Sequence, residues 1–167
     1  MDLTSLLHRI QIDLLLHGQA YRFYIESAVV AVLFYVAFTD FRTFKIRNDV
    51  LLLLLVLYVL FALISRSWLE ILWNIILAII VFAVFLQFYT YKLVGGGDIK
   101  LMAVVCLWIG THCALLYSAL FLLLIGLHLV AARMGWAQTK PMAGRNAIPY
   151  APSIAGALIG VIMLGCL

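Results

Sequence analysis

The sequence predicts an all-α membrane protein with about six transmembrane helices. Of its 167 residues, 67% are hydrophobic and only 11% are charged, against about 25% charged residues in a soluble domain. Lipid offers the backbone no hydrogen-bond partners, so only helices or a closed barrel can span it. The apolar runs are continuous and rich in leucine, whereas a barrel strand alternates polar and apolar residues. Helices are therefore favoured.

The N-terminal segment, residues 1–22, is predicted to be an amphipathic helix at the membrane interface. Its apolar residues fall at helical spacing and have polar residues between them; they are Leu3, Leu6, Leu7, Ile10 and Leu14. A frayed tail is the alternative interpretation. Residues 23–167 are predicted to form one membrane domain.

Four spans follow from the apolar runs at residues 25–39, 50–64, 69–89 and 148–167. The uncharged stretch 101–132 would be about 48 Å long as one helix, against a hydrocarbon core of about 30 Å. Gly110, Thr111 and His112 offer a turn near its middle. Two short spans joined by that turn are predicted.

Positive charge supports this division and predicts an orientation. With six spans, the connectors 40–49, 90–100 and 133–147 share one side of the membrane and hold most of the cations: Arg42, Lys45, Arg47, Lys92, Lys100, Arg133, Lys140 and Arg145. Basic connectors favour the cytoplasm, so both termini are predicted to lie outside. The net charge of +4 is then explained by topology, and no nucleic-acid partner is expected.

Three cysteines, Cys106, Cys113 and Cys166, lie in apolar surroundings without paired spacing. That pattern favours small buried thiols over a disulfide or a zinc site.

Two of the seven acidic residues lie at matching places. Asp40 closes the first span, and Asp98 follows the third span and precedes the fourth. Both are then at one membrane depth on one side, as a catalytic pair requires. Two adjacent carboxylates cannot both ionise easily, so one keeps a proton; the pair can act as base toward water and as acid toward a leaving amine. Ionisable groups at the membrane are costly and usually functional.

Structural roles compete with this interpretation. Asp40 could pair with Arg42 at a helix end, and Asp98 and Asp49 could each be the N-cap of the following helix. Lys100 could be only a topology-setting charge. Gly95, Gly96 and Gly97 could form a plain turn, or could use positive φ angles and let a substrate backbone approach closely. Other hydrolytic signatures, His-Glu-x-x-His and Gly-x-Ser-x-Gly, are absent from the sequence.

Three segments carry a family resemblance. Gly95-Gly96-Gly97-Asp98-Ile99-Lys100 resembles the Gly-x-Gly-Asp motif of type IV prepilin peptidases, a class of membrane aspartyl proteases. Residues 40–48 resemble the segment around the family's first aspartate, with Arg47 where proline is common. Residues 148–155 resemble its proline–tyrosine segment, with Ala151 where glycine is common.

The resemblance implies an aspartyl endopeptidase that uses Asp40 and Asp98, without metal or cofactor, to remove the short basic leader of a prepilin at the cytoplasmic face of a bacterial inner membrane. The small size resembles the CpaA or TadV group of tight-adherence (Flp-type) pilus systems. The residues expected to support the site or to bind substrate are Gly95, Gly96, Gly97, Lys100, Asn48 and Pro149. The expected partners are a prepilin and the lipid bilayer.

The sequence is also compatible with two rival functions. One is a non-catalytic subunit of a transport or secretion machine, in which the aspartates bind a cation or contact helices. The other is a presenilin-like protease, which would place its first aspartate deeper in the bilayer than Asp40.

Overall fold

The described part of the chain forms six helices and one short hairpin. The computed structural model describes residues 3–43, 45–65, 67–91, 94–135, 140–142, 145–147 and 150–167. Side chains are described from residue 20 onward, except at 64–65 and in the hairpin. The predominantly helical fold that the sequence predicts is confirmed.

The helices follow one another along the chain with short connectors. Their bounds are α1 Leu3–Thr43, α2 Asn48–Ser65, α3 Trp68–Thr90, α4 Gly96–Ile109, α5 Ala114–Arg133 and α6 Ala151–Met163. Between α5 and α6, the strands β1 (Lys140–Met142) and β2 (Arg145–Ala147) pair antiparallel, with Lys140 opposite Ala147. The sequence did not predict this hairpin.

Among the described residues, three helical segments are long and apolar enough to cross a membrane: Ala20–Thr43, Trp68–Thr90 and Ala114–Arg133. Segments of α2 and α6 are apolar but shorter. Helix α4 has 14 residues, about 21 Å, against a hydrocarbon core of about 30 Å. A membrane protein is therefore supported, whereas the count of six spans stays a prediction.

The predicted break in the stretch 101–132 is confirmed. Helix α4 ends at Ile109, and the backbone N–H of Gly110 donates to the carbonyl of Cys106 over 3.2 Å. Gly110 has a φ of 63°, a region that side chains with a Cβ disfavour. Glycine therefore lets the chain leave α4 and begin α5 four residues later.

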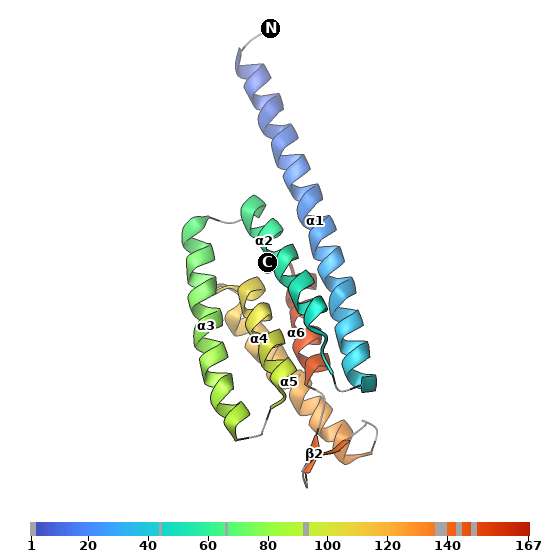
Figure 1. Ribbon diagram of the computed structural model, residues 1–167. Helices are drawn as coiled ribbons and strands as arrows, with labels where there is room; N and C mark the ends of the chain where they lie inside the picture. The colour runs from blue at the N-terminus through green and yellow to red at the C-terminus, as the bar shows by residue number, and fades with distance from the viewer. Residues whose placement is uncertain are drawn as a thin grey trace.

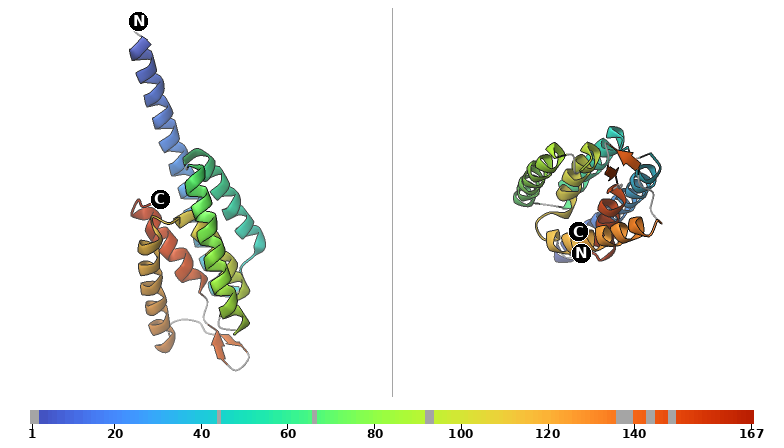
Figure 2. Two further views of the ribbon diagram at one scale, coloured as in Figure 1. Left: turned by 90° about the vertical axis from the view of Figure 1, so that its left-hand side faces the viewer. Right: turned by 90° about the horizontal axis from the view of Figure 1, so that it is seen from below.

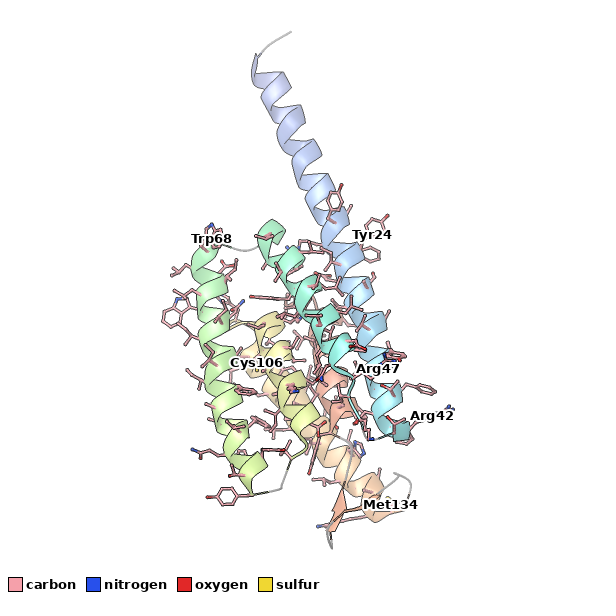
Figure 3. All side chains as sticks on the ribbon, in the orientation of Figure 1. Tyr24, Arg42, Arg47, Trp68, Cys106 and Met134 are labelled. Atoms are coloured by element: carbon pink, nitrogen blue, oxygen red, sulfur yellow. A yellow bond between two sulfur atoms is a disulfide. The ribbon has the colours of Figure 1, made fainter. Side chains whose placement is uncertain are left out.

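The six helices alternate in direction. Figure 1 shows that α1, α3 and α5 end, and α2, α4 and α6 begin, at one end of the bundle. We call this the aspartate end, because Asp40 lies in the last turn of α1 and Asp98 in the first turn of α4. Figure 3 shows Arg42 and Met134 toward this end and Tyr24 and Trp68 toward the other. The helix ends that flank the three connectors thus meet at one end of the bundle, as predicted, whereas the side of the membrane stays a prediction.

Helix α1 is continuous through residue 22, and its first half extends away from the bundle (Figure 2). The predicted amphipathic segment, residues 1–22, lies mostly before the first described side chain. Its placement at the membrane interface stays a prediction.

Helix α6 lies in the core, against α1, α4 and α5. Six of its side chains are at most 2% exposed: Ala151, Ile154, Ala155, Ala157, Leu158 and Val161. A Cβ added to Gly156 or Gly160 would come within 3.1 Å of Leu124 or 3.0 Å of Leu120 of α5. Small residues let helices in lipid approach closely, so these glycines set the spacing between α5 and α6.

One prediction about the cysteines is wrong. Cys113, just before α5, and Cys166, just after α6, form a disulfide across 53 residues of sequence. The sequence pattern failed because nothing in its spacing shows that the α4–α5 turn meets the end of α6. We call this the disulfide end of the bundle, and it is opposite the aspartate end (Figure 2). Cys106 is a buried free thiol, as predicted.

Candidate active site

Asp40 is a buried carboxylate with one oxygen left open. Its side chain is 4% exposed, and Oδ2 has no hydrogen-bond partner among the residues that the structure describes. The backbone N–H of Ala151, the first residue of α6, donates to the carboxylate. The alternative pairing with Arg42 is wrong, because the Arg42 guanidinium lies 4.5 Å from the centre of the Phe38 ring. Asp40 therefore caps another helix and keeps an oxygen for other chemistry.

The start of α6 explains why Ala151 is the donor. The first four N–H groups of a helix have no partner within it. Pro152 has no N–H, and the N–H groups of Ser153 and Ile154 both donate to the carbonyl of Tyr150 over 3.0 Å. The Ala151 N–H is left, and Asp40 accepts it. A carboxylate there also faces the positive end of the helix dipole.

Asp98 occupies the first turn of α4. The helix begins at Gly96 with Gly95 as its N-cap, so the alternative of Asp98 as the N-cap is wrong. Asp98 is instead the third helical residue, and its carboxylate accepts a hydrogen bond from the backbone N–H of Gly95. A third-position carboxylate that reaches back to the cap is half of a capping box. The helix start therefore fixes the orientation of Asp98.

The two carboxylates are coupled. Asp98 lies outside the three candidate spans. Burial first, and then the negative charge of Asp40, raise the pKa of Asp98 to about 7, while the hydrogen bond from Gly95 opposes the rise. The charge of Asp40 is therefore near enough to act on Asp98 across the aspartate end. The site can thus hold one proton between two acids near neutral pH, as the sequence predicts for a catalytic pair.

Two of the three glycines, Gly95 and Gly97, allow a close approach of neighbouring groups, and the expectation of positive φ angles is wrong for all three. Among the described glycines, φ is positive only at Gly110, Gly135 and Gly165. A Cβ on Gly95 would lie 3.0 Å from Oδ2 of Asp98, and one on Gly97 would lie 3.2 Å from Cβ of Ile46. On Gly96 it would lie 3.5 Å from the Tyr89 ring, an ordinary contact. Gly95 and Gly97 thus leave room for Asp98 and for the α1–α2 connector.

A side chain at position 97 is expected to damage the site. Gly97→Val would push Ile46 and the first turn of α4 apart and displace Asp98, because the added Cβ would already lie 3.2 Å from Cβ of Ile46 and the two methyl groups beyond it need further room. Displacement of a catalytic group by about 1 Å can cost roughly a hundredfold in rate, so peptidase activity should fall roughly tenfold to a hundredfold. Gly126→Val in α5 is the matched control, since a Cβ there meets nothing within 4 Å. Equal loss in both variants would contradict this role of Gly97.

Two further predicted site residues, Asn48 and Lys100, lie near the N-terminal ends of α2 and α4. Lys100 Nζ donates to Oδ1 of Asn48 over 3.2 Å, which ties the first residue of α2 to the second turn of α4. Asp49 is not the N-cap of α2; the helix begins at Asn48, and Asp49 pairs with Arg47 over 2.8 Å. Pro149 lies outside the described residues.

Sequence reasoning missed two contributors to the site. Ala151 acts through its backbone N–H, and Ile46 through its contact with Gly97; neither has a side chain that signals chemistry. The resemblance of residues 148–155 to a family segment was the only signal for Ala151. In the part of the chain that the structure describes, no three His, Cys, Asp or Glu side chains gather as metal ligands would.

The type IV leader peptidase family model matches residues 27–132, more than half of the chain, and this range includes both aspartates. The chain belongs to the type IV leader peptidase family. Comparison with curated proteins and with solved structures found no further match. Membership supports a peptidase that acts in a membrane, and the two coupled carboxylates of this leader peptidase agree with such an activity.

Proposed function

We propose that this leader peptidase is an aspartyl endopeptidase that removes the short basic leader of Flp-type prepilins at the cytoplasmic face of the bacterial inner membrane. The observation that carries the proposal is the pair of carboxylates: Asp40 is buried, its Oδ2 has no hydrogen-bond partner among the described residues, and burial together with the charge of Asp40 raises the pKa of Asp98 to about 7. Family membership supports the substrate class.

The proposed chemistry needs one proton on the pair. The ionised carboxylate takes a proton from water, and the water oxygen attacks the scissile carbonyl. The carboxylic acid first supports the developing oxyanion and then gives its proton to the leaving amine. The N–H of Ala151 and the N–H of Gly95 hold the two carboxylates in place, so little reorganisation is needed during the reaction.

Supporting roles follow from the same geometry. Lys100 and Asn48 hold the starts of α2 and α4 together, while Gly95 and Gly97 give the pair and its connector room. We propose that Gly96, which is exposed, lies beside the bound substrate backbone. Pro149 stays a proposed site-supporting residue on the family resemblance of residues 148–155 alone.

The proposed orientation has two supports. Arg42, Lys45, Arg47, Lys100 and Arg133 belong to the aspartate end, whereas Arg22 lies at the disulfide end, and cations favour the cytoplasmic side. Disulfides persist in oxidising compartments, which suits a disulfide end outside the cytoplasm. Six spans would place the short helices α2, α4 and α6 across a locally thinned bilayer.

The function is tested by co-expression with an Flp-type prepilin and by the mass of the pilin N-terminus. Loss of the leader only in the presence of the chain supports the proposal. A pilin that keeps its leader, with the chain folded and in the membrane, would favour a non-catalytic membrane subunit instead.

The rate of cleavage should depend on pH through the one proton that the Asp40–Asp98 pair holds. Because the pKa of Asp98 is raised to about 7, the pair holds its proton below that pH and loses it above. We expect kcat/KM to fall as pH rises through about 7, approaching a tenfold loss per pH unit, as for one essential proton. Purified peptidase in lipid nanodiscs, assayed between pH 5 and 9 with helicity monitored, provides the measurement. A flat profile up to pH 9 would exclude a shared proton with this pKa.

A further inference from the structure

Helix α6 is attached to the rest of the bundle at both of its ends. At the aspartate end the Ala151 N–H donates to Asp40, and at the disulfide end Cys166 is bonded to Cys113. We propose that the Cys113–Cys166 disulfide is a positioning clamp that keeps α6 in the axial register at which the Ala151 N–H meets Asp40. Reduction of this disulfide should therefore impair catalysis at the far end of the helix. The catalytic part of this inference rests on the proposed function.

The segment that joins the disulfide to α6 is short and is fixed by backbone hydrogen bonds. The helix ends in a Schellman arrangement: Gly165 has a φ of 67°, its N–H donates to the carbonyl of Ile162 over 2.9 Å, and the Cys166 N–H donates to the carbonyl of Val161 over 3.3 Å. Cys166 is thus bonded to the last turn of α6 through its own backbone. A force on its sulfur is transmitted to the helix.

The other half of the disulfide is equally well fixed. Cys113 is 2% exposed and is the N-cap residue of α5, where its carbonyl accepts the N–H of Tyr117 over 2.9 Å. The α4–α5 turn that contains Cys113 begins at the positive-φ Gly110. The disulfide therefore joins a helix end to a tight turn, rather than two loose loops.

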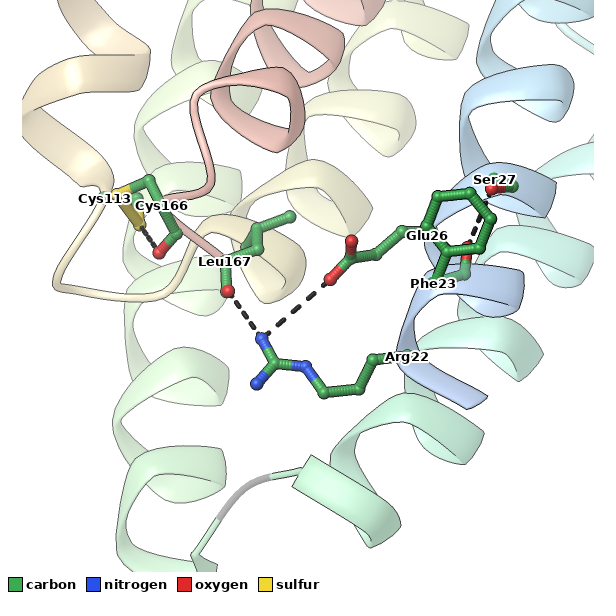
Figure 4. A network of polar contacts seen from close by, with 7 residues as sticks. All are labelled: Arg22, Phe23, Glu26, Ser27, Cys113, Cys166 and Leu167. Carbon is green, nitrogen blue, oxygen red and sulfur yellow. Dashed lines mark hydrogen bonds and ion pairs between the residues drawn. A yellow bond between two sulfur atoms is a disulfide. The ribbon is translucent and has the colours of Figure 1, made fainter. Parts of the chain in front are cut away.

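Helix α1 is tied to the same two places. At the disulfide end, Arg22 of α1 donates to the carbonyl oxygen of Leu167 over 2.6 Å, and its guanidinium also lies 3.9 Å from Glu26 (Figure 4). At the aspartate end, Asp40 of α1 accepts the N–H of Ala151. With α1 and α6 joined at both ends, an axial shift of α6 would strain one attachment or break the other.

The distance between the clamp and the site makes the proposal testable. Ala151 and Met163, the first and last residues of α6, are about 12 residues of helix apart, roughly 18 Å. Cys166 lies beyond the C-cap residue that follows Met163. A disulfide that merely stabilises its surroundings would leave amides at the far end of α6 unchanged. A clamp that sets register would alter them, because a helix shifts as a rigid rod.

The experiment uses the purified full chain in nanodiscs, treated with dithiothreitol. The dithiol is oxidised to its cyclic disulfide, and the two sulfurs of Cys113 and Cys166 each gain a proton and become thiols. Hydrogen exchange of the first turn of α6, residues 151–155, is measured by mass spectrometry before and after treatment. Cleavage of a prepilin peptide is followed in parallel.

Reduction should weaken the charge-assisted hydrogen bond between the Ala151 N–H and Asp40. We therefore expect faster hydrogen exchange at the first turn of α6 and about a tenfold fall in kcat, while KM changes less than twofold. Re-oxidation should restore both. Cys113→Ser and Cys166→Ser should behave like the reduced protein and no longer respond to dithiothreitol. Cys106→Ala, which leaves the disulfide intact, should respond as the wild type does.

Two outcomes would overturn the clamp: unchanged exchange at the first turn of α6 after complete reduction, or faster exchange with kcat unaltered. If the oxidised wild type cleaves no prepilin but its exchange still responds to reduction, the coupling along α6 stands and the proposed function fails. The exchange measurement thus separates the two ideas.

Discussion

Replacement of either aspartate of the pair by asparagine is expected to abolish leader cleavage, with a loss of at least about a thousandfold. General acid–base catalysis contributes roughly 10² to 10⁴ in rate, and an amide can neither accept nor release the proton that the mechanism needs. Asparagine is close in size, and its carbonyl oxygen can still accept the N–H of Ala151 at position 40. Asp40→Asn and Asp98→Asn should therefore fold while losing activity.

The measurement is the mass of the pilin N-terminus after co-expression with wild type, with each single variant and with Asp49→Asn. Asp49 is the matched control, because it belongs to the same end of the bundle but is exposed and pairs only with its neighbour Arg47. Processing should survive in this control. Cleavage that persists in Asp40→Asn or Asp98→Asn would remove the pair from the mechanism and favour a structural or cation-binding role.

The sequence was sufficient to predict which residues share an end of the bundle. Alternating spans, basic connectors and the break at Gly110 together place Asp40 and Asp98 at the same end, and the structure agrees, because α1 ends and α4 begins at that end. These inferences depend only on the order of the apolar runs and on the positions of the charged residues, both of which are visible in the amino-acid sequence. They need no knowledge of which helices touch.

Contacts between distant segments were not predictable in this way. Nothing local in the sequence indicates that Cys113 meets Cys166, or that a backbone N–H of α6 serves Asp40 of α1. Both depend on the central position of α6, which only helix packing determines. The glycines illustrate the same limit: their presence was evident, but the reason for Gly97 is the approach of Ile46 from another connector.

Helix α4 carries Asp98, and its placement depends on a buried tryptophan nearer the disulfide end. Trp108 is fully buried, its Nε1–H donates to the carbonyl of Leu54 in α2 over 3.2 Å, and its ring lies 5.7 Å from that of Tyr58 and 5.3 Å from that of Phe61. Helices in lipid associate through van der Waals packing and hydrogen bonds. This one side chain therefore provides both kinds of contact between α4 and α2.

Trp108→Ala is expected to lower the free energy of unfolding by about 3–5 kcal/mol, the usual cost of removing a buried aromatic side chain. Peptidase activity should fall with it, because a loosened α4 no longer holds Asp98 against Asp40. Trp108→Phe keeps most of the packing and loses only the hydrogen bond, so about 1 kcal/mol is expected. Unfolding in a denaturing detergent, followed by circular dichroism, measures each difference.

Trp68→Ala is the matched control, because Trp68 begins α3 and is 81% exposed. Its removal opens no cavity, so stability and activity should stay close to those of the wild type. If Trp68→Ala and Trp108→Ala destabilised the chain equally, loss of an aromatic side chain anywhere at the membrane would explain the effect. If Trp108→Ala were neutral, α4 would be held by its contacts with α3 and α6, and the position of Asp98 would depend on those helices.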